Sequence, residues 1–62
     1  MKRKELKNLA KKIAKYEQIV QNDEDPSAVR EAQLAIMEIS GTVHSLEDMM
    51  LIDEYVQDIL AN

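Results

Sequence analysis

Apolar residues recur along the first third of this chain in the alternating three- and four-residue steps of an amphipathic helix. The repeating positions, with no glycine or proline between them, are Leu6, Leu9, Ile13, Tyr16 and Val20. At about 100° per residue, they share one face of a helix. The opposite face then carries a lysine row: Lys4, Lys7, Lys11 and Lys15. The pattern predicts a helix over about 2–22 that buries its apolar face.

Capping signals divide the rest of the chain into two further helices. Asp25 followed by Pro26 fits an N-cap and a first helical residue, where the missing proline N–H costs no hydrogen bond. Gly41, the only glycine, is placed to end that helix in a left-handed conformation. Ser45 precedes an acidic turn and predicts the start of a third helix. The expected fold is all-α, a single small domain over 1–62 with helices at about 2–22, 26–40 and 46–61.

The second and third helices carry more apolar residues than one core face can hold. The expected core positions of the second are Ala28, Val29, Ala32, Ala35, Ile36 and Ile39. Those of the third are Leu46, Met49, Ile52, Val56, Ile59 and Leu60, with Tyr55 at the edge. Four apolar residues lie outside these faces, on either side of one turn: Leu34, Met37, Met50 and Leu51.

We interpret these four residues as an oligomer interface. Isologous dimers are the commonest assembly, so a helical-bundle homodimer is the expected form. A chain of 62 residues also buries only about 60% of its unfolded surface and needs further stabilisation. It has no cysteine for disulfides or thiolate zinc sites, which favours association or very regular packing. A rotated core that includes all four residues, or a surface for a different protein, are the alternatives.

Charge is distributed unevenly along the chain. Residues 1–15 carry seven basic and one acidic side chain, a local charge of +6, whereas 16–62 carry one basic and eleven acidic, a local charge of −10. The lysine row points away from the apolar face instead of flanking it, so pairing with packed acidic helices does not account for it. It is a solvated face, a surface for an acidic protein partner, or a nonspecific contact for nucleic-acid phosphates or an anionic membrane. The acidic third helix argues against a base-reading helix-turn-helix.

Side chains suited to catalysis are few. His44 stands three and four residues before Glu47 and Asp48, an arrangement that could orient a general base or ligate a metal. Because the chain has no second histidine, we interpret His44 as a turn residue with local hydrogen bonds. Glycine-rich phosphate loops and calcium loops are absent from the sequence. We therefore expect no catalytic residue, no cofactor, no metal and no enzymatic activity.

The sequence also bears on location. No stretch approaches the roughly 18 apolar residues of a membrane span, and the basic start lacks the apolar core of a signal peptide. We expect a cytoplasmic protein without a membrane partner.

Two stretches, LAKKIAKYEQIVQ and IMEISGTVHSLEDMMLIDEYVQDIL, resemble short helical proteins encoded by tailed phages of marine cyanobacteria. The resemblance implies a phage accessory protein that binds a host or phage component in the host cytoplasm. Together with the residue pattern, it predicts a small protein that acts by protein–protein interaction through a helical bundle. Nonspecific nucleic-acid binding through the lysine row is the alternative function.

Overall fold

Three α-helices make up the fold, and the computed structural model describes all residues, 1–62. They are α1 (Arg3–Asn22), α2 (Pro26–Gly41) and α3 (Leu46–Ala61), without any strand. The predicted all-α fold and its three helices are confirmed, with ends that agree to within one residue. None of the three has the length and apolarity that crossing a membrane requires.

The starts of α2 and α3 are capped as the sequence predicts. The Asp25 side chain accepts a hydrogen bond from the Ser27 amide at 3.0 Å, and Pro26 occupies the first turn. The Ser45 hydroxyl accepts from the Asp48 amide at 3.4 Å. Both bonds satisfy amide groups that have no partner within the helix, so each cap fixes where its helix begins.

The end of α2 differs from the prediction. Gly41 is the last helical residue and does not adopt a positive φ. Thr42 ends the helix in a right-handed conformation, and both its amide and its hydroxyl donate to the Ile39 carbonyl, at 3.1 and 2.7 Å. The Val43 amide donates to the Ser40 carbonyl in the same way, so the helix ends in right-handed turns without a left-handed glycine.

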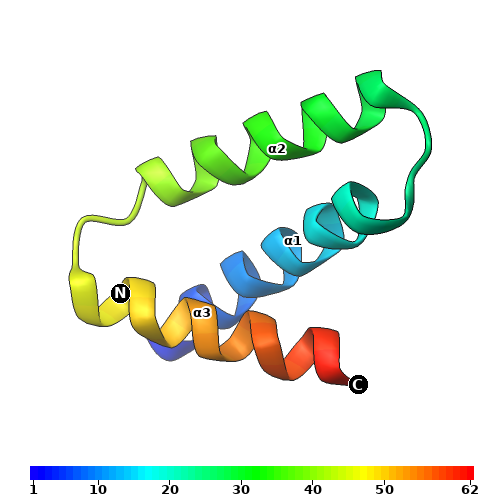
Figure 1. Ribbon diagram of the computed structural model, residues 1–62. Coiled ribbons are helices and arrows are strands. Elements are labelled where there is room, and N and C mark those ends of the chain that lie inside the picture. Colours follow the sequence, from blue (N-terminus) through cyan, green and yellow to red (C-terminus); the bar gives the residue numbers. More distant parts are fainter.

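The arrangement of the helices is centred on α1. Both α2 and α3 pack against α1, whereas they make few contacts with each other. Figure 1 shows α2 and α3 running in opposite directions on either side of a gap, with α1 behind them. Two layers result, one of α1 and one of α2 and α3, and the Cα atoms extend over 34 × 25 × 15 Å. The first helix therefore folds back on its own chain.

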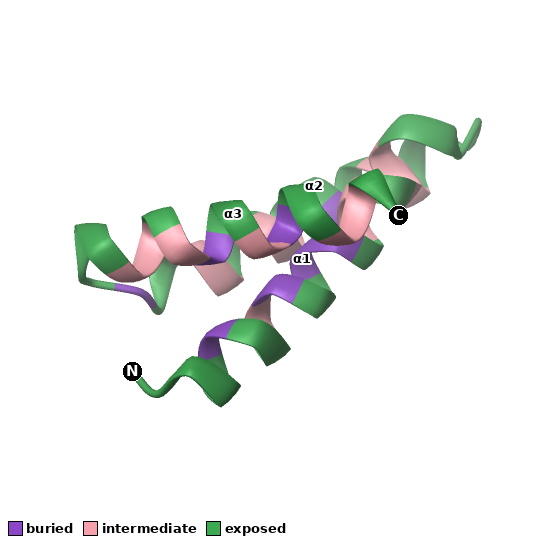
Figure 2. Ribbon diagram, turned by 90° about the horizontal axis from the view of Figure 1, so that it is seen from below, coloured by how far each residue is buried: buried purple, intermediate pink, exposed green.

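The core is small and lies where α1 meets its two neighbours (Figure 2). On α1 the buried residues are Leu6, Ala10, Ile13 and Ala14. Their mean direction is rotated by about 60° from the stripe that the sequence predicts, at 100° per residue. The buried face is therefore centred nearer to Ala10 and Ala14. Leu9, Tyr16 and Val20 lie toward its edge and are only half-buried.

Three residues outside α1 are placed differently from the prediction. Leu46, expected in the core, is 77% exposed: it is the first residue of α3 and does not pack against the core. Leu51, expected outside it, is half-buried and packs against the core. Val43, in the connection between α2 and α3, is buried although no helical pattern includes it. Val43 packs with core residues of α1 and α3, so the connection itself contributes to the core.

Candidate interaction surfaces

The gap between α2 and α3 is a groove with α1 as its floor. We call it the central groove, and its volume is about 270 Å³. It opens to solvent because α2 and α3 do not close over α1. All three helices contribute lining residues, among them Ile13, Glu17, Ile36, Ile52, Asp53 and Val56.

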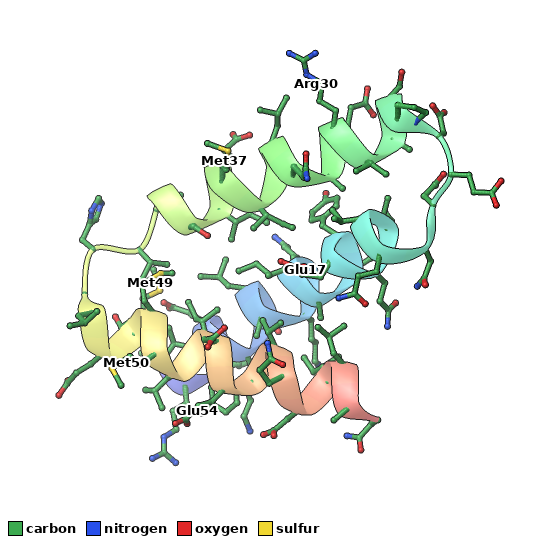
Figure 3. The ribbon with its side chains drawn as sticks, in the orientation of Figure 1. Glu17, Arg30, Met37, Met49, Met50 and Glu54 are labelled. Carbon is green, nitrogen blue, oxygen red and sulfur yellow. The ribbon has the colours of Figure 1, made fainter.

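Two carboxylates stand in this partly apolar groove. Glu17 projects from α1 between the other two helices (Figure 3), and Asp53 lines the groove from α3. No lysine, arginine or histidine is among the lining residues. The only ion pair of the protein joins the Met1 amine to Asp48, at 3.3 Å, so neither groove carboxylate is paired. The central groove is therefore acidic.

A second surface is the side of α2 that faces away from α1. Arg30, Leu34 and Met37 follow one another there at spacings of four and three residues, which align them along one helix face. Leu34 is 56% exposed and Met37 is 68% exposed. Arg30 and Met37 both project away from the rest of the molecule in Figure 3. We call these three residues the outer face of α2.

The four residues predicted to form an oligomer interface are thus divided between two sides of the protein. Leu34 and Met37 belong to the outer face of α2, whereas Met50, 60% exposed, projects from the far side of α3 (Figure 3). Leu51 borders the same hollow as Met50, but its side chain is half-buried and packs against the core. Sequence spacing could not reveal this division, because it depends on the angle between α2 and α3.

The lysine row is exposed along its length, but its members have different surroundings. The Lys7 ammonium lies 5.6 Å from the centroid of the Tyr55 ring on α3. Lys15 borders a hollow between α1 and α2 that also includes Glu38. Lys4 and Lys11 complete the row, and none of the four forms an ion pair. The exposure and the absence of ion pairs agree with the outward direction that the sequence predicts. Lys7 differs from the other three in lying beside an aromatic ring of α3.

His44 is exposed in the connection between α2 and α3. The predicted position in the turn is confirmed, but the side chain makes no hydrogen bond, so the predicted local bonding is wrong. His44 has no capping role because Thr42 bonds to the end of α2 and Ser45 caps the start of α3. No three histidine, aspartate or glutamate side chains are grouped so that they could hold a metal ion.

Comparison of the chain with protein-family models, with curated proteins and with solved structures finds no match.

Proposed function

We propose that this protein is a small accessory factor that acts by binding other proteins, without catalytic activity, and that it does so as a homodimer. The observation that carries the proposal is the incomplete packing of the three helices. Because α2 and α3 both pack on α1 but barely on each other, one chain leaves apolar surface open on two sides. Exposed apolar patches of this kind mark sites where proteins associate.

The outer face of α2 fits a second copy of this chain. In an antiparallel pair of α2 helices, Leu34 of each copy meets Met37 of the other, which gives the self-complementary contact of a two-fold dimer. The same pairing places Arg30 beside the last turn of the other α2. That turn contains Glu38 and the negative end of the helix dipole, and it has no basic residue of its own. Charge complementarity therefore supports a second copy of the chain as the partner of this face.

Sedimentation equilibrium tests the dimer. We expect the original protein to be dimeric at micromolar concentration and the double variant Leu34→Gln/Met37→Gln to be monomeric. Met50→Gln is the matched control, since it removes an equally exposed methionine from the far side of α3 and leaves the dimer intact. A folded monomer in the original protein, or a dimer that only Met50→Gln disrupts, contradicts the proposal.

Nonspecific nucleic-acid binding is the second candidate function, and the lack of ion pairs along the lysine row favours it. Lys4, Lys11 and Lys15 are free to contact phosphates, although the acidic remainder of the chain repels a duplex beyond the contact. A mobility-shift assay with DNA and RNA at low salt tests this function. Binding that disappears in the triple lysine-to-glutamine variant supports it, and no shift with the original protein excludes it.

A further inference from the structure

The central groove lies over α1 between α2 and α3, where one more helix would complete a four-helix arrangement. α2 and α3 each cover one flank of α1, and the floor between them carries Ile13 with Glu17 beside it. Half-buried apolar residues of both walls, Ile36 and Met49 among them, face this space. A fourth helix laid here would bury them and convert the open three-helix arrangement into a four-helix bundle.

Charge decides which helix can occupy the groove. Glu17 and Asp53 have no cationic neighbour in it, so an occupant that excludes water must supply positive charge or leave two carboxylates unpaired. Two copies joined groove to groove would bring four carboxylates together without a single cation. Like charges in a partly desolvated interface are strongly unfavourable. The groove is therefore unsuited to a symmetric contact with itself.

The exposed helix faces of a second copy are also poor occupants. The free face of α1 has lysines, but the other residues on that face are polar: Asn8, Gln18 and Asn22. It therefore offers no apolar side chain to the groove. The far side of α3 has Leu46 and Met50 but also Glu47 and Glu54, which repel the groove carboxylates. The outer face of α2 inserted head to tail would build a ring or an open filament, and this face is already used in the proposed dimer.

We propose that the central groove binds an amphipathic helix of a different protein, whose apolar stripe is flanked by lysine or arginine. The apolar stripe packs on the half-buried Ile36, Met49 and Leu60, and the basic flanks pair with Glu17 and Asp53. This inference rests on the proposed function as a binding protein. It adds where the partner binds and what charge the partner carries.

Two synthetic peptides of about 18 residues test the inference, a length that can form a helix. Both carry the same stripe of leucines. One has lysines flanking the stripe and the other has glutamates. Fluorescence anisotropy at physiological salt measures binding, and 15N chemical shifts locate it. We expect the lysine peptide to bind about tenfold more tightly than the glutamate peptide, with shifts at Ile36, Met49 and Leu60.

Variants of equal net charge separate the groove from general attraction to an acidic protein. Glu17→Gln/Asp53→Asn removes both groove carboxylates, and Glu47→Gln/Glu54→Gln removes two charges from the far side of α3. Circular dichroism establishes that both variants keep their helices. We expect the first variant to lose the preference for the lysine peptide and the second to keep it.

Four results overturn the inference: no binding of either peptide, equal binding of both, equal losses in the two variants, or shifts confined to the far side of α3. Assemblies that grow beyond the dimer, and that Glu17→Gln/Asp53→Asn dissolves, also overturn it by identifying a second copy as the occupant. The dimer has its own readout, since Leu34→Gln/Met37→Gln acts on the outer face of α2. Failure of the groove and failure of the proposed dimer are therefore distinguishable.

Discussion

The ammonium group of Lys7 lies 5.6 Å from the centroid of the Tyr55 ring, which joins α1 to α3 through a cation and an aromatic face. Lys7 is part of an exposed lysine row, and the buried face of α1 includes Ala10 and Ala14 one and two turns further along the helix. The small alanine side chains allow α3 to approach this side of α1. One lysine of the row therefore contributes to the packing between helices.

Replacing Lys7 by glutamine is expected to lower the free energy of unfolding by about 0.5 kcal/mol, because the attraction to the Tyr55 ring is lost at an exposed site. Urea denaturation at constant protein concentration measures the change. Lys11→Gln removes the same charge from the same helix without a ring beside it and is expected to change stability less. Equal effects of the two substitutions contradict this role of Tyr55.

Ile52 and Leu46 provide a direct comparison within α3. Ile52 is 2% exposed, so Ile52→Ala leaves a cavity and is expected to lower the free energy of unfolding by about 2–4 kcal/mol. Leu46 is 77% exposed, and Leu46→Ala is expected to change it by no more than about 0.5 kcal/mol. Thermal unfolding followed by circular dichroism measures both. A large loss in Leu46→Ala places that residue in a buried contact instead.

Gly41→Ala is expected to stabilise the protein by up to about 0.5 kcal/mol. Gly41 is helical without a positive φ, and an added Cβ meets no atom within 4 Å. Alanine loses less backbone entropy than glycine on folding, so the substitution favours the native state. The midpoint of urea denaturation measures the effect. Destabilisation instead indicates a left-handed residue at this position.

Asp25→Ala is expected to lower the free energy of unfolding by about 1 kcal/mol, since the Ser27 amide loses its acceptor at the start of α2. Asp25→Asn keeps a side-chain oxygen in place and is expected to retain most of the stability. Chemical denaturation of the two variants measures the difference. If the variants are equally destabilised, the negative charge matters more than the hydrogen bond.

The three helices were predictable because their signals are local. Polar caps at Asp25 and Ser45, Pro26 in a first turn and a single glycine near a helix end act within a few residues of the chain. Apolar spacing likewise gave most of the packed positions, including Ile13, Ile52 and Val56. Even the Gly41 prediction placed the helix end correctly and was wrong only about its backbone conformation.

The angles at which the helices meet were not predictable, since they depend on how closely side chains far apart in the sequence can approach. Ala10 and Ala14 admit a second helix and rotate the buried face of α1, which in turn brings Lys7 to Tyr55. The sequence by itself determined where the helices begin and end and which residues are charged. Only the tertiary structure decided that α2 and α3 stay apart, that Leu34 and Met50 lie on different sides, and that Glu17 stands in a groove. The physical reason is that helix formation is local, whereas packing selects one arrangement of all three helices at once.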